Sequence, residues 1–338
     1  MVSHQQVAAA FVAMGQHLQQ LPEHELERLC EGACTRNSWF IAAHVRKALE
    51  GIAHMLRPEA LQQWLVAYDL PVKQPKTIGV IMAGNIPLAG FHDFLCVLLS
   101  GHKLAAKMSS QDNFLLPQLA DMLFEIVPEL QEHVQWVEQL KAVDAIIATG
   151  SDNTSRYFKY YFSKYPHIIR SNRVSVAVLD GSETLEELAG LAHDTMLYFG
   201  LGCRSIAKIF VPEGYDFVPF LQQTEKLSAL VDNHKYRNNY DYQKSIFLVN
   251  RVPHLDSGFL LLTENEGVVS PMSVVYYQYY RKREEIIQLL EAHADKLQCV
   301  ASHDKCLFSR TVNFGQTQMP GIADYADGID TMSFLLRV

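Results

Sequence analysis

The chain has 338 residues, of which 49% are hydrophobic and 20% are charged, and its formal net charge is −8. These values are typical of a soluble globular protein, and the length corresponds to about two domains at roughly 150 residues each. Lysine and arginine form no dense block, which argues against a nucleic-acid partner. The longest apolar stretch, 86–100, contains His92 and Asp93 and is shorter than the roughly 20 residues that cross a bilayer, so no membrane span is expected.

The six cysteines include no Cys-x-x-Cys pair, although Cys30 and Cys34 are one helical turn apart. In a chain of this length the pattern predicts reduced thiols in a cytoplasmic protein and no metal site. The N-terminus lacks a basic segment followed by an apolar one, so no secretory signal is expected.

Residues 1 to about 70 carry apolar stripes at helical spacing and predict helices. Short apolar runs then alternate with helical patterns, and this alternation predicts a parallel, doubly wound sheet. The strands expected in this block are 77–82, 103–108, 134–137 and 144–148. The helices expected between and after them are 88–99, 115–127 and 154–165.

A second alternating block begins near Arg173, where Thr184-x-x-Glu187 has the pattern of a capping box that opens a helix. Its expected strands are 174–179, 206–211, 245–249, 258–262 and 273–280. The sequence therefore predicts an α/β protein with two doubly wound parallel-sheet lobes and an active-site cleft between them. We expect a nucleotide-binding domain with a helical N-terminus, a catalytic domain and a C-terminal return strand, at 1–172, 173–325 and 326–338.

Cys203 is the residue that points most directly to chemistry. It stands in the run Gly200-Leu201-Gly202-Cys203, between the predicted helix and the strand 206–211. Glycines there allow a sharp turn and close approach of a substrate. Asn85, just past the strand 77–82, is placed to donate to an oxyanion, and the pair suggests acyl transfer. A buried structural thiol is the alternative for Cys203 taken alone.

A nucleotide site is less clearly marked. No G-x-G-x-x-G follows the first predicted strand, so the usual dinucleotide fingerprint is missing. Thr149-Gly150-Ser151 follows a strand and starts a helix, where Ser151 can cap the helix and the first N–H groups can accept phosphate. Lys107, at the end of another strand, is either a ribose or phosphate contact or a surface lysine.

These segments together resemble the aldehyde dehydrogenase superfamily. Gly84-Asn85-Ile86-Pro87, the strand ending Lys107-Met108-Ser109, the turn Thr149-Gly150-Ser151 and Gly202-Cys203 are similar to its motifs, in the same order, over roughly 75–210. Glu266 begins a run that is similar to the E-x-F-G-P motif, with one extra residue. Within the superfamily the chain most resembles the LuxC-type fatty acyl-CoA reductases.

The resemblance implies a nucleophilic Cys203 and an oxyanion site formed by Asn85 and the Cys203 N–H. It implies a homo-oligomer that reduces an acyl-CoA or acyl-carrier thioester with NADPH or NADH. The cofactor contacts that it implies, Glu266 only approximately, are Lys107, Ser109, Thr149, Gly150, Ser151 and Glu266.

Two departures from the superfamily pattern bear on the reaction. The segment 167–173 has no carboxylate where aldehyde-oxidising members carry a general base, which favours thioester chemistry over hydrolysis. Ser110 replaces a glutamate that would repel a 2′-phosphate, which favours NADPH without excluding NADH. The alternatives are an acyl-phosphate reductase, an aldehyde dehydrogenase with another base, and a non-catalytic nucleotide- or acyl-binding protein.

Overall fold

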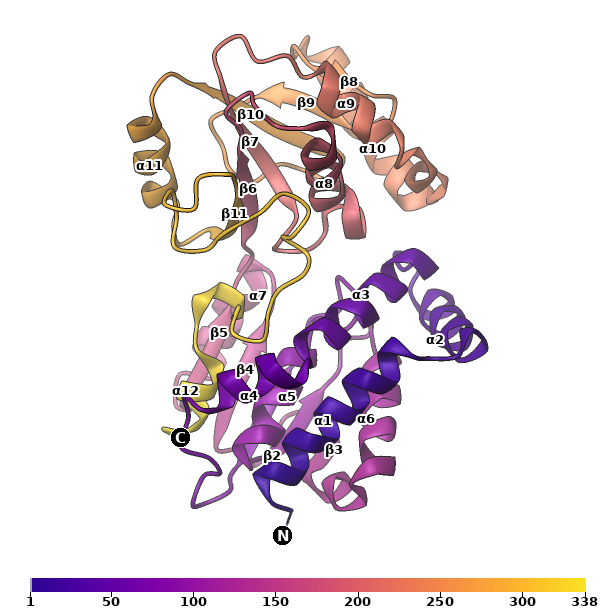
Figure 1. The fold of residues 1–338 in the computed structure, drawn as a ribbon, viewed down its shortest axis with the longest axis vertical. Coiled ribbons are helices and arrows are strands. Elements are labelled where there is room, and N and C mark those ends of the chain that lie inside the picture. Colours follow the sequence, from indigo (N-terminus) through magenta and orange to yellow (C-terminus); the bar gives the residue numbers. More distant parts are fainter. Residues whose placement is uncertain (1) are drawn as a thin grey trace. The chain divides into compact units, whose positions relative to one another are not determined.

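The structure is a computed structural model that describes residues 2–338 (Figure 1). Its contacts divide the chain into two compact units. The first unit runs to Asn172 and also contains Pro320–Val338, and the second unit is Arg173–Met319.

The first unit begins with four helices, α1 (His4–Gln19), α2 (Glu23–Arg36), α3 (Ala42–Met55) and α4 (Pro58–Leu65). They confirm the helical N-terminus that the apolar stripes predict. The side chain of Ser3 accepts a hydrogen bond from the Gln6 N–H, and Gln6 reaches back, so a capping box starts α1. Phe11 of α1 is fully buried, and its ring meets the ring of Phe94 edge to face at 6.0 Å.

A five-stranded sheet forms the centre of this unit, and every neighbouring pair in it is parallel. Its strands are β1 (Thr77–Ile81), β2 (Lys103–Lys107), β3 (Val134–Trp136), β4 (Ala145–Thr149) and β5 (His167–Arg170). The connecting helices are α5 (Phe91–Ser100), α6 (Leu115–Ile126) and α7 (Asp152–Tyr161). The parallel sheet that the sequence predicts is thus confirmed, with β5 as a strand that it missed.

The strand order of this sheet is β3-β2-β1-β4-β5. The chain therefore winds outward from β1 to β3, then returns to the other side of β1 and winds outward again. In open α/β sheets, ligands bind outside the carboxyl ends of the strands at the point where the winding direction reverses. Here that point lies between β1 and β4.

The second unit is built on a seven-stranded sheet of order β12-β11-β6-β7-β10-β9-β8. All its pairs are parallel except β8 with β9. The strands are β6 (Val174–Val178), β7 (Ile206–Pro212), β8 (Leu255–Asp256), β9 (Leu261–Glu264), β10 (Val274–Tyr280), β11 (Leu297–Ala301) and β12 (Thr311–Val312). The helices are α8 (Leu185–Met196), α9 (Val218–Glu225), α10 (His234–Val249) and α11 (Arg283–Ala292).

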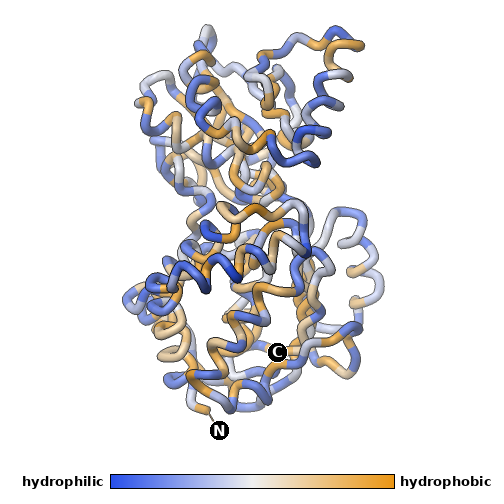
Figure 2. The backbone as a smooth tube through the Cα atoms, turned by 90° about the vertical axis from the view of Figure 1, so that its right-hand side faces the viewer, coloured by the Kyte–Doolittle hydropathy of each residue, from blue (hydrophilic) through white to orange (hydrophobic). Residues whose placement is uncertain are grey.

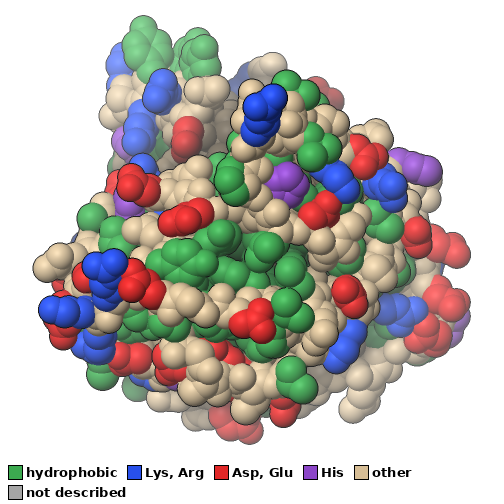
Figure 3. All heavy atoms as spheres, turned by 90° about the horizontal axis from the view of Figure 1, so that it is seen from above, with side chains coloured by type: hydrophobic (Ala, Val, Ile, Leu, Met, Phe, Trp, Pro, Cys, Tyr) green, Lys and Arg blue, Asp and Glu red, His purple; other side chains and the backbone are tan. Residues whose placement is uncertain are grey.

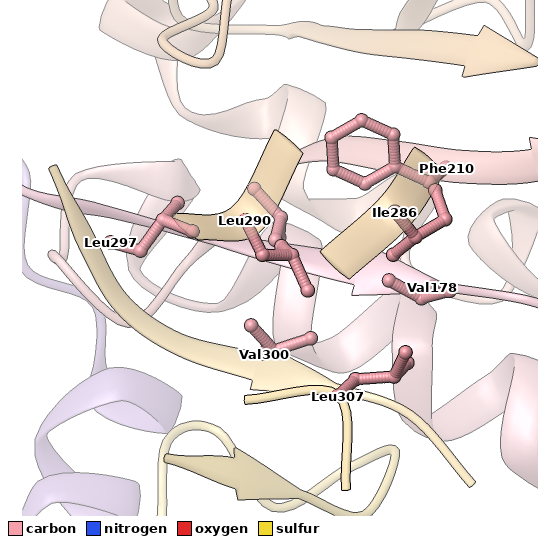
Figure 4. Close-up of a cluster of buried hydrophobic side chains, with 8 residues drawn as sticks. Val178, Phe210, Ile286, Leu290, Leu297, Val300 and Leu307 are labelled. Atoms are coloured by element: carbon pink, nitrogen blue, oxygen red, sulfur yellow. The ribbon is translucent and has the colours of Figure 1, made fainter. Parts of the chain in front are cut away.

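Helices cover both faces of this second sheet, with α11 on one side and α8 on the other (Figure 1). Because successive side chains of a strand point to opposite faces of the sheet, both faces present apolar side chains to the helices. Under α11, Ile286 and Leu290 pack with Val178, Phe210 and Val300 in a buried cluster (Figure 4). The predicted capping box of α8 is present, since Thr184 and Glu187 bond each other's backbone N–H groups.

Two sequence-based predictions of secondary structure are wrong, and a third is displaced, since the strand expected at 258–262 is found as β9 at Leu261–Glu264. Residues 245–249 are not a strand but the last turn of α10, a helix that Asn233 caps and that buries Tyr236, Tyr240 and Phe247 at helical spacing. A short apolar run does not by itself distinguish a strand from a helix end.

The expected return strand 326–338 is also absent. This segment forms a single 3-10 turn and the short helix α12 (Thr331–Leu335), which Asp330 caps and which buries Met332 and Leu335. Moreover, the chain leaves the second unit after Met319, so 320–325 belongs to the first unit rather than to the catalytic domain predicted as 173–325.

Along the helices and strands of both units the backbone alternates between hydrophilic and hydrophobic residues (Figure 2). Within residues 2–338, no helix combines the length and the apolarity that crossing a membrane would demand. On the face shown in Figure 3, acidic and basic side chains are interspersed around a central group of hydrophobic ones.

Candidate active site

In the first unit, the predicted oxyanion and cofactor residues meet at one edge of the sheet. Asn85 follows the carboxyl end of β1 and is exposed, Lys107 is the last residue of β2, and Thr149 is the last residue of β4. Because β2, β1 and β4 are adjacent and parallel, their carboxyl ends lie side by side. The structure therefore brings these three residues to the carboxyl edge of the sheet, with Asn85 and Thr149 beside the winding reversal.

The turn from β4 into α7 has the geometry of an anion site. Ser151 is the N-cap of α7, and its hydroxyl accepts the Thr154 N–H at 3.3 Å, as its sequence position predicts. A Cβ on Gly150 would lie 3.0 Å from the Thr154 side chain, so a larger residue would press on Thr154 and glycine lets the turn pass closely. The first N–H groups of α7 and the positive end of its dipole thus face the carboxyl edge of the sheet.

Ser109 supports the Asn85 turn from the neighbouring strand. A Cβ on Gly84 would lie 2.5 Å from the Ser109 Oγ, so the two backbones approach closely only because residue 84 is glycine. The same hydroxyl accepts the Gln111 N–H at 3.1 Å. Ser109 therefore has a clear structural role beside Asn85, in addition to the cofactor contact that its sequence position predicts.

Asp112 is a functional candidate that the sequence reasoning missed. Its carboxylate is buried and accepts the Leu88 N–H at 2.7 Å, on the turn that carries Asn85. Burial raises the pKa of Asp112 to about 6, against the opposing effect of hydrogen bonds from the Leu88, Leu115 and Phe114 N–H groups. An aspartate shortly before the first apolar residues of α6 was the available signal, since this is a helix-capping pattern.

In the second unit, Cys203 lies in a tight and conformationally strained connection. After α8, the backbone of Tyr198, Phe199 and Gly200 adopts φ values of 55°, 56° and 74°. This left-handed region suits glycine but is costly for aromatic residues, so tertiary packing must hold them. The ring of Phe199 is buried and stacks on Tyr236 with centroids 5.3 Å apart.

Cys203 itself occupies a turn that closes before β7. The Ser205 N–H donates to the Gly202 carbonyl at 3.0 Å, and the Ser175 hydroxyl donates to the Cys203 carbonyl at 3.1 Å. Gly202 and Ser205 are buried, whereas the Cys203 side chain is partly exposed. The turn is therefore anchored on both sides of a thiol that solvent can reach.

Two further features bear on the reactivity of this thiol. Helix α8 ends at Met196, and the unfavourable effect of a helix C-terminus on a thiolate falls off within the last turn. Cys203 lies seven residues beyond that end, so this effect on its thiolate is small. Cys299 is buried at 3.1 Å from the Ser175 Oγ, and burial raises the pKa of its thiol. Cys299 is thus held protonated in the core, and Cys203 is the more accessible thiol of the two.

A second buried carboxylate, Asp194 of α8, anchors the loop that supports the turn carrying Cys203. It accepts the N–H groups of Gly315 at 2.6 Å and Thr317 at 3.1 Å. The next residue of that loop, Gln318, donates to the Ser205 hydroxyl at 3.2 Å. Burial raises the pKa of Asp194 to about 7. The sequence reasoning missed this residue because its partners lie more than a hundred positions away.

Glu266 follows the carboxyl end of β9 and contacts β7, the strand that Cys203 precedes. The Glu266 carbonyl accepts a hydrogen bond at 2.8 Å from Lys208, a buried lysine whose pKa burial lowers to about 8. The cofactor contact that the resemblance implies for Glu266 stays a prediction.

One group of possible metal ligands is present at the second sheet. Asp180, Glu183 and His303 have ligand atoms within 4.8 Å of one another. His303 also bonds the Glu187 carboxylate at 2.5 Å, and this contact raises the pKa of the imidazole. The Asp180 N–H donates to the Glu183 carboxylate at 2.6 Å, and the His303 ring lies 3.8 Å from the Asp180 carboxylate. The group is largely exposed, and the prediction that the protein has no metal site stays a prediction.

The architecture of both units is that of an aldehyde dehydrogenase. An NAD-dependent aldehyde dehydrogenase from Sinorhizobium meliloti superposes with a TM-score of 0.68 at 12% identity, over 92% of this chain and 74% of that one. HpcC from Thermus thermophilus gives a TM-score of 0.63 at 14% identity, over 92% and 72% of the two chains. At these identities the likeness defines the fold alone, and it confirms the predicted fold class.

Sequence comparison places the chain more narrowly. The family described as acyl-CoA reductase (LuxC) matches residues 14–229, and the chain belongs to this family. The long-chain acyl-protein thioester reductases of Aliivibrio fischeri and Vibrio harveyi are each 25% identical, over 59% and 63% of this chain. The matches cover 45% and 51% of those relatives, so the chain spans about half their length. The resemblance recognised from Asn85, Lys107, Ser151 and Cys203 is thereby confirmed at the level of the family.

Proposed function

We propose that the protein reduces a fatty acyl thioester to the aldehyde through an S-acyl intermediate on Cys203. The observation that carries this proposal is the position of Cys203, a partly exposed thiol in an anchored turn at the start of β7. Membership of the acyl-CoA reductase family supports a thioester substrate. The names of the relatives add a second form of it, in which a protein carries the acyl group.

In this mechanism the Cys203 thiolate attacks the thioester carbonyl and forms the new C–S bond. The Asn85 carboxamide and the Cys203 N–H donate hydrogen bonds to the oxygen as it gains negative charge. When the carbonyl re-forms, the C–S bond to the carrier breaks and the carrier leaves as a thiolate. The product of this half-reaction is the acyl group on the Cys203 sulfur.

The residues at the carboxyl edge of the first sheet fit a nicotinamide cofactor. Thr149, Gly150 and Ser151 would hold its pyrophosphate at the start of α7, and Lys107, with Ser109 beside it, would hold a ribose. Bound there, the reduced cofactor would supply the hydride that converts the S-acyl enzyme to aldehyde. Solved relatives of the fold include a Mycobacterium tuberculosis aldehyde dehydrogenase complexed with NAD⁺.

NADPH is the proposed form of the cofactor because Ser110 stands where a glutamate would repel the 2′-phosphate. Glu266 is retained as an approximate cofactor contact, and its carbonyl is held by Lys208 of β7 at 2.8 Å. The segment 167–173 still lacks a carboxylate, which supports release of the acyl group by reduction rather than by hydrolysis.

The test is oxidation of NADPH, followed by its absorbance, with saturated acyl-CoA substrates of increasing chain length. We expect chain-dependent turnover that Cys203→Ala abolishes and that Cys306→Ala, a change at an exposed cysteine, leaves intact. Failure of the wild-type protein with every acyl-CoA and acyl-protein thioester, under both NADPH and NADH, would refute the proposal. Turnover of acyl phosphates alone would point instead to an acyl-phosphate reductase.

The resemblance also suggests a homo-oligomer, which sedimentation equilibrium would test. We also propose a cytoplasmic location, because a reactive thiol at Cys203 suits a reducing compartment.

A further inference from the structure

The turn that carries Asn85 contains a strained residue whose backbone N–H points at a buried acid. Leu88 adopts a φ of +60°, a left-handed conformation that is uncommon for a bulky side chain. Its N–H donates to the Asp112 Oδ2 at 2.7 Å, and both residues are buried, 6% and 5% exposed. An ionised carboxylate is a stronger acceptor than a carbonyl, so this is a strong hydrogen bond.

In Asp112→Asn the Leu88 N–H would face either an uncharged carbonyl oxygen, which is a weaker acceptor, or an NH2 group, which cannot accept, so the turn would have reason to rearrange. A buried N–H that loses its partner is costly, and the left-handed backbone of Leu88 adds strain. Both costs fall if the segment relaxes to an extended conformation that turns the N–H elsewhere. Asp112 therefore stabilises a conformation that the local sequence does not favour by itself.

The residue before Asn85 also contacts the segment that contains Asp112. Gly84 packs directly on Ser109, with no room for a Cβ, and the Asp112 N–H closes the Ser109 turn by donating to the Ser109 carbonyl at 3.2 Å. The 109–112 turn is itself held by the buried side chain of Asn37, whose amide donates a hydrogen bond to the Gln111 carbonyl at 3.0 Å. The residues on both sides of Asn85 thus rest on one rigid turn, 109–112.

We propose that Asp112 is a positioning residue, which holds the turn 84–88 so that the Asn85 carboxamide is directed at the thioester oxygen. This inference rests on the proposed function, because it needs Asn85 to act as the oxyanion donor. Asp112 is buried, so in this proposal its effect is transmitted through the Leu88 N–H.

The test is the acylation half-reaction of Asp112→Asn, measured without cofactor as the burst of coenzyme A released from an acyl-CoA. We expect the burst rate at saturating substrate to fall about tenfold to hundredfold, with little change in the acyl-CoA concentration that half-saturates it. The rate of Cys203 alkylation by iodoacetamide and the affinity for NADPH should remain within about twofold. Asp144→Asn is the matched control, because Asp144 accepts the Thr77 N–H at the opposite end of β1, at 2.8 Å.

A second pair of variants tests the route through Leu88. Glycine adopts a positive φ without strain, so in a Leu88→Gly background the Asp112→Asn change should slow acylation several-fold less than in the wild type. An equal loss in both backgrounds would show that the strain at Leu88 is not what Asp112 controls.

The outcomes separate this inference from the proposed function. If the wild-type protein gives no burst and no turnover, the proposed function fails first. If it does give a burst, a normal burst in Asp112→Asn overturns the positioning role. A variant that loses NADPH affinity or alkylation rate as strongly as acylation would also overturn it, since that pattern indicates general loosening of the unit.

Discussion

Replacing Asp194 with asparagine should change how the stability of the protein depends on pH. The carboxyl group is 1% exposed, and burial raises its pKa from 3.8 to about 7. Between these two values the folded protein holds a proton at Asp194 that the unfolded chain has released. The free energy of unfolding that this group contributes is therefore largest at low pH and is lost as the pH rises toward 7.

The magnitude follows from the two pKa values. A shift of about three units corresponds to about 4 kcal/mol in total, at 1.36 kcal/mol per unit. Between pH 5 and pH 8 the titration curve assigns about 2.5 kcal/mol of loss to Asp194. Asparagine does not titrate, so the variant should lack this component of the pH dependence.

The assay is urea unfolding, followed by circular dichroism at pH 5, 6, 7 and 8, for the wild type and Asp194→Asn. The stability difference between the two proteins should change by about 2.5 kcal/mol across this range in favour of the variant, because other titrating groups cancel in the difference. Glu186→Gln, at an exposed position of the same helix, should leave that difference constant. A constant difference for Asp194→Asn, within about 0.5 kcal/mol, would refute the argument that burial of the carboxyl group dominates.

Two further predictions concern packing. Arg170 donates two hydrogen bonds to Asp93, at 2.6 and 2.9 Å, and both side chains are buried. Arg170→Met should therefore lower the stability of the first unit by about 3–5 kcal/mol, since it leaves a buried carboxylate without its cation. Urea unfolding followed by tryptophan fluorescence measures this loss of stability. A loss below about 1 kcal/mol would contradict the prediction. A Cβ on Gly190 would lie 2.9 Å from the Gly315 nitrogen, so Gly190→Ala should cost about 1–3 kcal/mol. Gly51→Ala is its control, because nothing lies within 4 Å of the added methyl group, and thermal melts in which both variants behaved alike would contradict the steric argument.

The local sequence pattern was enough to predict much of the fold and to select part of the candidate site. The short apolar runs at 77–82, 103–108 and 144–148 predict strands of a parallel sheet because the alternation with helices leaves few other arrangements. Ser151 caps α7 and Thr184 caps α8, since capping depends on residues within one turn. Cys203 and Asn85 could be selected as candidates because their glycines, prolines and flanking strands are contiguous in the chain.

The tertiary structure decided what depends on distant partners. The bond between Leu88 and Asp112 joins residues 24 positions apart, and that between Asp194 and Gly315 joins residues 121 apart. No local pattern encodes such a contact, because whether a carboxyl group is buried depends on what packs over it. The same reason explains the two misread segments, 245–249 and 326–338. Their few apolar residues suit either a strand or a helix, and burial of one face against another element selected the helix in both.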